Sequence, residues 1–259
     1  MKKILLEACC GSAADVFAAK SAGADRAELS AALALGGLTP SLGAMELAAK
    51  AGLPIIAMVR PRSGGFCYNE YEFQTMCRDA EALLSAGAAG IAFGILLADG
   101  RVDEKRCAAL LRHIGDQQSV FHRAFDVTPD WREAMDSLCG LGFTRILTSG
   151  QALSALEGAQ TLAHMVEYAG GRIEILPGGG IRPHNAAELI RQTGCDQLHA
   201  SLSAVCTDPS IPENSAIRFG GRDLPAENLY TRLDAAGFET LVNLMQTEIS
   251  LCDMRSGSI

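Results

Sequence analysis

The sequence predicts a single-domain TIM (β/α)8 barrel with a long excursion of the chain after the eighth strand. Short β-rich runs alternate with longer stretches rich in Ala and Leu. Such alternation indicates a parallel sheet with right-handed crossovers. Eight units of this kind within 259 residues match a closed barrel. The alternative, a doubly wound open sheet that binds a nucleotide, is disfavoured because the first turn, CCGSAAD, lacks a G-x-G-x-x-G motif.

The strands are expected where short runs of β-forming residues occur, and the helices where longer helical patterns lie between them. The strands are predicted at 4–9, 26–30, 54–61, 90–96, 119–125, 144–149, 172–178 and 197–201. The helices are predicted at 12–21, 41–51, 70–86, 103–114, 130–140, 154–169 and 183–192, with a last helix within 230–250. Glycine follows several of these helices, as in SAGAD, KAGLP and QTGCD, and glycine just past a helix end is the usual stop signal.

The segment 203–229 separates the eighth strand from the last helix. It contains Pro, Gly, Ser and Asn and shows little periodicity, so we expect an irregular excursion there. No linker composition divides the chain, and one barrel domain is therefore expected over 1–259.

Composition and charge exclude several classes of function. A net charge of −8 with only 22 Lys and Arg residues leaves no basic surface for nucleic acid. The apolar runs are far shorter than the ~20 residues of a membrane span. Nine irregularly spaced cysteines without a C-x-x-C motif indicate reduced thiols in a cytoplasmic protein. The N-terminal run Ile4–Leu6 is ended by Glu7, which argues against a signal peptide.

Polar residues gather at the carboxyl ends of the predicted strands, where barrels of this class carry their sites. The residues that we single out are Glu7, Cys9, Glu28, Ser30, Arg60, Arg62, His122, Arg123, Asp126, Ser149, Gly178, Gly179, Gly180, His199 and Ser201. Residues two apart on a strand share a face, so Glu7 and Cys9 are expected to point into the barrel together. Cys10 then faces the helices, where a free cysteine packs as a small apolar residue.

Two interpretations of this cluster stay open. In the first, the carboxylates and guanidiniums only neutralise one another in a buried network. In the second, they form a pocket for a small anion, either a phosphate or a carboxylate. The glycines of PGGGI would then bring backbone N–H groups to the ligand. The arginines Arg60, Arg62 and Arg123, with Ser149 and Ser201, would add side-chain contacts. The glycines could equally serve a tight turn that needs positive φ.

Catalysis, if present, would use proton transfer. Candidate groups are Glu7, Glu28, His122, Asp126 and His199, and two facing carboxylates could share one proton. No lysine lies at a predicted strand end, so a Schiff-base mechanism is disfavoured. No Cys/His quartet has the spacing of a structural zinc site.

Several motifs, in order along the chain, resemble the CutC family. They are ADRAEL with GGLTPSLG, VRPRSGGFCYNEYEF, FHRAFD, RILTSG with ALEG, and GRIEILPGGGIRP, and the resemblance spans about residues 4 to 202. It implies a cytoplasmic TIM barrel that forms homo-oligomers and has a proposed role in copper homeostasis through Cu(I) binding.

The same resemblance implies two cysteine ligands for Cu(I), one ending strand 1 and one ending strand 2. The first position is Cys9, but the second is Ser30. This departure matters because Cu(I) prefers soft thiolate and thioether ligands over a hydroxyl. Cys67, in the loop after the third strand, is another thiol that could reach the mouth. Copper handling, an enzyme for a small anionic metabolite, and a non-catalytic binding or assembly module therefore all remain open.

Overall fold

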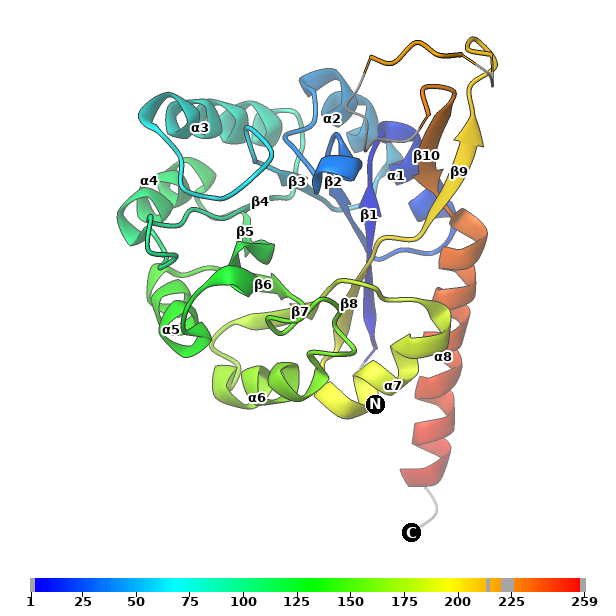
Figure 1. The fold of residues 1–259 in the computed structure, drawn as a ribbon. Coiled ribbons are helices and arrows are strands. Elements are labelled where there is room, and N and C mark those ends of the chain that lie inside the picture. The colour runs from blue at the N-terminus through cyan, green and yellow to red at the C-terminus, as the bar shows by residue number, and fades with distance from the viewer. Residues whose placement is uncertain (1–2, 213–214, 220–225, 257–259) are drawn as a thin grey trace.

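Eight parallel strands form a barrel in the computed structural model, which describes residues 3–212, 215–219 and 226–256 (Figure 1). The sheet has the order β7-β6-β5-β4-β3-β2-β1-β8. A parallel bridge between Gly178 and His199 joins its two edges. The predicted TIM barrel is therefore confirmed. The strands are β1 (Leu5–Cys10), β2 (Arg26–Leu29), β3 (Ile55–Met58), β4 (Gly90–Phe93), β5 (Gln118–Phe121), β6 (Arg145–Thr148), β7 (Glu174–Pro177) and β8 (Gln197–Ala200).

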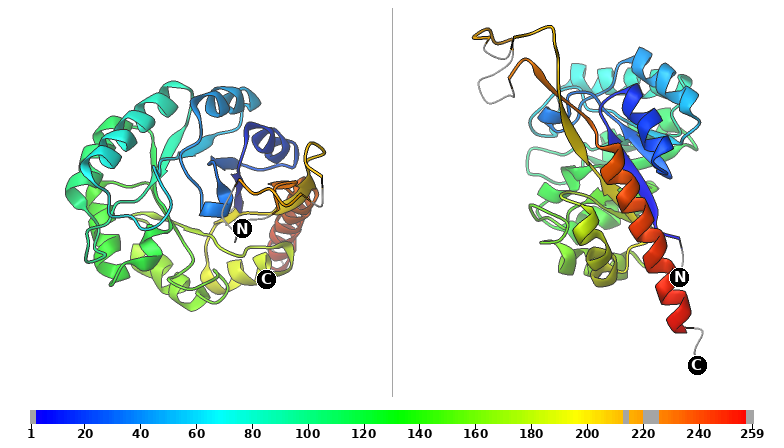
Figure 2. Two further views of the ribbon diagram at one scale, coloured as in Figure 1. Left: turned by 45° about the horizontal axis from the view of Figure 1, so that its top comes forward. Right: turned by 90° about the vertical axis from the view of Figure 1, so that its right-hand side faces the viewer.

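Helices surround the strands as an outer ring (Figure 2). They are α1 (Ala13–Ser21), α2 (Leu42–Ala48), α3 (Glu70–Ser85), α4 (Glu104–Ile114), α5 (Trp131–Leu141), α6 (Ala159–Ala169), α7 (Pro183–Thr193) and α8 (Ala235–Ser256). Short 3-10 turns lie at η1 (Leu33–Leu35), η2 (Ala49–Ala51) and η3 (Arg123–Val127). None of the helices within the described residues has the length and hydropathy needed to cross a membrane.

Local sequence explains where helices begin. At α3, Asn69 and Glu72 form a reciprocal capping box, in which each side chain accepts a hydrogen bond from the other residue's backbone N–H. At α5, the Asp130 carboxylate accepts from the N–H groups of Arg132 and Glu133. These caps satisfy helix N–H groups that have no partner within the helix.

The barrel interior is divided into an apolar and a polar part. Six buried apolar side chains, contributed by β3 to β7, pack together inside the barrel: Ile56, Met58, Ala92, Val120, Leu147 and Leu176. Strands β1, β2 and β8 bring buried polar side chains, and β6 adds one more. They are Glu7, Arg26, Glu28, Gln197 and His199, with Arg145 of β6. The polar groups predicted from strand alternation are thus concentrated on one side of the barrel.

The chain beyond β8 differs from the expected irregular segment. An antiparallel hairpin of β9 (Ser203–Thr207) and β10 (Leu229–Leu233) lies there, and it extends away from the barrel (Figure 2). The predicted last helix therefore starts at Ala235, because residues 230–233 are paired in β10. The alternating side chains of this stretch suit a strand. Within the expected excursion 203–229, residues 213–214 and 220–225 lie outside the described residues. Within the expected domain 1–259, the same holds for residues 1–2 and 257–259.

Strand 5 ends earlier than predicted. His122 and Arg123 are expected in a strand over 119–125, but β5 ends at Phe121 and the chain turns into η3. The His122 ring accepts a hydrogen bond from the Ala124 N–H through Nδ1 at 3.1 Å, which caps this turn. Similarly, α6 begins at Ala159 rather than at 154, because residues 151–158 form turns.

We expect Asp15→Ala to loosen the hairpin. The buried Asp15 carboxylate accepts from the Leu233 N–H at 2.9 Å and from the Gly11 N–H at 3.0 Å. Leaving such donors without an acceptor costs about 1–3 kcal/mol each when they are buried. Hydrogen–deuterium exchange should become faster at Leu233 while β3 and β4 stay protected. Asp25→Ala is the control, since Asp25 accepts from Leu6 N–H at 3.0 Å. Unchanged exchange at Leu233 in Asp15→Ala would contradict this role.

Candidate functional site

A cavity of about 540 Å³ opens at the carboxyl ends of the barrel strands. Its size is within the range of small-molecule sites. Nine of the residues singled out from the sequence line it: Cys9, Glu28, Ser30, Arg60, His122, Arg123, Gly179, His199 and Ser201. The expectation that the polar strand ends converge on one mouth is met for these residues.

Glu7 lies at the base of this site and not in the cavity wall. In the sheet it stands opposite Arg26 on one side and His199 on the other. Its carboxylate forms an ion pair with Arg26 and a 2.7 Å hydrogen bond with His199 Nδ1. Burial raises the pKa of Glu7, but the hydrogen bond from His199 and the charge of Arg26 outweigh this and lower its pKa to about 2. Glu7 is therefore ionised and orients the His199 ring.

Cys9, Glu28 and His199 offer three metal-ligand atoms within 4.8 Å of one another. The register of β1 and β2 places Cys9 opposite Glu28. Because Glu7 engages His199 Nδ1, the other ring nitrogen is the one left for a ligand, an orientation that is common at metal sites. These three donors come from adjacent strands, so the barrel backbone preorganises them.

The protonation of the three donors is coupled through their charges. Burial raises the pKa of the Cys9 thiol, and it raises the pKa of Glu28 to about 7. Burial opposes protonation of His199, but the charge of Glu28 and hydrogen bonds with Cys9 and Glu7 raise its pKa well above 6.5. No side-chain hydrogen bond of Glu28 is found within the described residues, although Glu28 is only 4% exposed. The arrangement can hold a cation or move a proton.

The two arginines after β3 have different surroundings. Arg60 lines the cavity and is buried, and its guanidinium donates to the carbonyls of Leu35, Gly37 and Gly64 at 2.8–3.0 Å. Arg62 lies outside the cavity lining. It is paired with Glu72 and donates to carbonyls of its own loop. The prediction that Arg62 reaches the ligand is thus not supported by its position.

Arg123, Asp126 and Ser149 form a connected cluster. Arg123 donates to the Asp126 carboxylate at 2.7 Å and to Ser149 Oγ at 2.8 Å. Asp126 also accepts from the Ser149 N–H at 3.0 Å and from the Thr148 hydroxyl. Only Arg123 of the three lines the cavity. Asp126 is therefore engaged in holding the turn after β6, away from the position that proton transfer to a ligand would need.

The glycines after β7 have a structural explanation. Gly179 and Gly180 have φ of 104° and 73°, in the region that favours glycine. A Cβ on Gly178 would lie 2.5 Å from Leu147 Cδ1. Only Gly179 lines the cavity, and the Arg182 N–H at the start of α7 is already bonded to the Asn185 side chain at 2.8 Å. The turn itself therefore requires these glycines, which weakens their interpretation as a phosphate signal.

Some lining residues were not identified from the sequence. Asp15, Phe66 and Met58 line the cavity, as do Thr231 and Leu233 of the hairpin. Phe66 lies in the loop after β3, with its ring centroid 5.0 Å from that of His122. The hairpin residues lie more than 190 positions from β1 in the sequence, and no local sequence pattern predicts that they contact the barrel mouth.

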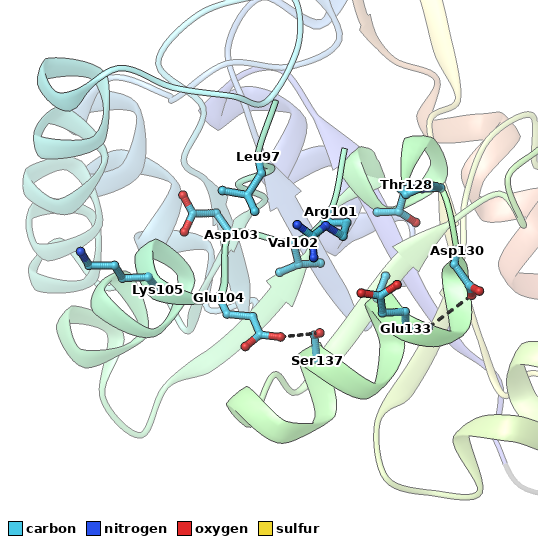
Figure 3. Close-up of a pocket in the computed structure, with 12 residues that line it drawn as sticks. Leu97, Arg101, Val102, Asp103, Glu104, Lys105, Thr128, Asp130, Glu133 and Ser137 are labelled. Atoms are coloured by element: carbon cyan, nitrogen blue, oxygen red, sulfur yellow. Dashed lines mark hydrogen bonds between the residues drawn. The ribbon is translucent and has the colours of Figure 1, made fainter. Parts of the chain in front are cut away.

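A second cavity, of about 490 Å³, lies between the starts of α4 and α5 on the outside of the barrel (Figure 3). Three of its four acidic side chains have structural partners. Asp103 and Asp130 cap the two helices, and Glu104 accepts from Ser137 Oγ at 2.6 Å. We assign it no functional role.

Comparison with known proteins then identifies the family. Residues 4–204 match the family model described as the CutC family. The chain belongs to the CutC family. A CutC family protein of Treponema denticola is 47% identical over 248 residues, which cover 95% of this chain and 100% of that protein. Another, from Agrobacterium fabrum, is 46% identical over 207 residues and covers 79% and 82%.

Solved structures agree with this membership. A CutC protein of Streptococcus agalactiae, to which copper homeostasis is ascribed, is 35% identical with a TM-score of 0.73 and covers 76% of this chain and 97% of its own. A phosphoribosylanthranilate isomerase of Thermotoga maritima is 11% identical with a TM-score of 0.52 over 94% and 99% of the two chains. The second likeness shows the barrel fold alone. The family model ends at residue 204, at the start of the hairpin, whereas the Treponema denticola relative aligns with 95% of this chain and therefore extends beyond that point.

We expect Glu28→Gln to flatten the pH dependence of stability. With its pKa raised to about 7, folded Glu28 keeps its proton where the unfolded chain has lost it. Stability therefore falls as pH rises from about 4.5 to about 7. The pKa of His199 is also raised in the folded protein, so stability falls further as pH rises above the pKa of His199 in the unfolded chain. The charge of Glu28 contributes to this raised pKa, so Glu28→Gln should weaken both effects. The melting temperature of the original chain should drop between about pH 5 and pH 8, and that of the variant should drop less.

The control for this prediction is Glu46→Gln, which changes an exposed glutamate on α2. It should reproduce the pH profile of the original chain. Circular dichroism melts at four pH values between these limits suffice. Parallel profiles for Glu28→Gln and the original chain would contradict the raised pKa of Glu28.

Proposed function

We propose that this CutC family member binds Cu(I) at the barrel mouth and takes part in handling copper in the cytoplasm. The observation that carries the proposal is the convergence of Cys9, Glu28 and His199 on one point, with donor atoms within 4.8 Å of one another. Family membership supports copper as the ion, since copper homeostasis is ascribed to the Streptococcus agalactiae relative. The ion is here cargo rather than a catalytic cofactor.

The chemistry of the donors suits this ion in part. A thiolate and an imidazole are good ligands for Cu(I), so Cys9 and His199 form the core of the proposed site. Met58 lines the same cavity and offers a thioether, which is also a soft ligand. Glu28 is a hard ligand, and its negative charge attracts the positively charged ion electrostatically. Ser30, at the second cysteine position implied by the family, adds no soft atom.

The cysteines support a reducing compartment. The eight whose side chains are described are free: Cys9, Cys10, Cys67, Cys77, Cys107, Cys139, Cys195 and Cys206. Cys10 is buried and faces away from Cys9, and Cys67 is exposed. Neither Cys10 nor Cys67 lines the cavity, so Cys9 is the thiol on which the proposal rests.

We expect Cys9→Ala to weaken Cu(I) binding at least about tenfold, which is about 1.4 kcal/mol. The thiolate is the softest of the three clustered donors, and its loss leaves an imidazole and a carboxylate, with the Met58 thioether as the remaining soft group in the cavity. Competition with a colorimetric Cu(I) chelator under anaerobic conditions measures the affinity. Cys67→Ala is the matched control and should leave the affinity unchanged. Equal affinities for Cys9→Ala and Cys67→Ala would overturn the proposed site.

We expect Ser30→Cys to tighten Cu(I) binding by at least about tenfold. The variant supplies a second thiol in the same cavity, and two thiolates suit Cu(I) better than one. Ser30→Ala is the control and should bind as the original chain does. Parallel titrations with Zn²⁺ test the choice of ion, because a thiolate, imidazole and carboxylate also suit zinc. Tighter binding of Zn²⁺ than of Cu(I) by the original chain would contradict a copper role.

A further inference from the structure

The cavity is much larger than a metal ion requires. Its volume of about 540 Å³ extends from Cys9, Glu28 and His199 to a second wall formed by β3, β5 and their loops. That wall carries Met58, Arg60, Phe66 and His122, with Ser30 from the end of β2. None of these is among the three clustered donors. The second wall therefore needs its own explanation.

His122 presents an unused hydrogen-bond donor. Its Nδ1 accepts from the Ala124 N–H at 3.1 Å, so in the neutral ring the proton is on Nε2. Burial and the neighbouring Arg60 lower the pKa of His122 to about 3, so the ring stays neutral. Nε2 has no partner within the described residues, and the side chain is 97% shielded from solvent, with 3% exposed. A buried donor without a partner is uncommon in native proteins.

Ser30, at the end of β2, is a second buried hydrogen-bonding group on this wall. Its hydroxyl is buried, and within the described part of the chain it has no hydrogen-bond partner. Arg60 adds a positive charge that no described carboxylate neutralises in an ion pair, since its guanidinium donates to the carbonyls of Leu35, Gly37 and Gly64. The same wall is otherwise apolar, with Met58 and Phe66. Unpaired donors, a buried positive charge and an apolar lining are together complementary to an organic anion.

We propose that this wall binds a small carboxylate with an apolar body, whose oxygens accept hydrogen bonds from His122 Nε2 and Ser30 Oγ. The charge of Arg60 favours the anion over its uncharged analogue. The Phe66 ring lies 5.0 Å from the His122 ring and 5.3 Å from the Arg60 guanidinium. Phe66 therefore lies beside both groups and would supply apolar surface for the body of the ligand. The site does not depend on the metal proposed for Cys9.

Benzoate and 3-phenylpropionate are suitable probes, with benzamide and 3-phenylpropanamide as uncharged analogues. At saturation the carboxylates should raise the melting temperature of the original chain by about 2 °C or more. The amides should bind at least tenfold more weakly by calorimetry. The measurements are made with a metal chelator present. The absence of a shift with both carboxylates, or equal binding of the amides, would overturn the proposal.

Four variants locate the site. Ser30→Ala removes a hydroxyl that has no hydrogen-bond partner among the residues that the structure describes, so the fold should be retained while carboxylate affinity falls several-fold. His122→Phe should reduce affinity at least tenfold, and His164→Phe, on the exposed face of α6, should not. Cys9→Ala should bind the carboxylates normally, since it removes only the proposed metal ligand. Unchanged affinity in both Ser30→Ala and His122→Phe, or loss in Cys9→Ala, would overturn the assignment to this wall.

The His122 ring gives a direct reading of binding. Nitrogen-15 spectra should show the neutral Nε2–H form in the free protein. Addition of 3-phenylpropionate should shift the Nε2 resonance, because its proton gains an acceptor. A shift at His164 with none at His122 would place the ligand elsewhere and contradict the proposal.

Discussion

The buried carboxylate of Glu7 is the constraint on which the site depends. A charge inside a barrel is costly unless it is paired and hydrogen-bonded. Glu7 meets this condition because the parallel register of β1 places Arg26 on one side and His199 on the other. Arg26 in turn donates to Gln197 Oε1 at 3.0 Å. The pairing of β8, β1 and β2 thus brings together the groups that neutralise the charge of Glu7. The same pairing orients His199.

The orientation of His199 also affects the layer of side chains nearer the mouth, which contains Cys9 and Glu28. With Nδ1 engaged by Glu7, the other nitrogen is directed to the layer that holds Cys9 and Glu28. Those two residues occupy paired positions of β1 and β2, two residues further along their strands than the Glu7–Arg26 pair. Strand alternation keeps both layers on the same face. Apolar side chains of β3 to β7 pack beside these layers inside the barrel, and Arg60 and His122 bring further polar groups to the mouth from the loops after β3 and β5.

Much of this was predictable from the sequence, because two periodicities determine it. The alternation of strands and helices predicted the barrel, and the period of two along a strand predicted that Glu7 and Cys9 share the interior. Glu28 and His199 were expected at the mouth because they lie near strand ends. Arg62 and Asp126 were expected at the mouth but do not line the cavity, because their partners are set by tertiary geometry. Arg62 forms an ion pair with Glu72 at the start of α3. Asp126 accepts hydrogen bonds from Thr148 and Ser149 at the end of β6. The hairpin was missed because its strands pair across more than 20 residues without a short turn motif.

Ser30 connects the two halves of the mouth. Relative to the cysteine that the family implies there, its side chain differs little in shape but greatly in chemistry, since a soft ligand becomes a hard donor and acceptor. The hydroxyl is buried beside Gly37, where an added Cβ would lie 3.1 Å from its oxygen. It has no partner among the described residues, so it does not serve the fold as a hydrogen-bonding group. Under the two proposals made for the mouth, a serine at this position would lower the affinity for a soft metal ion and would supply a polar contact for an oxygen-bearing ligand.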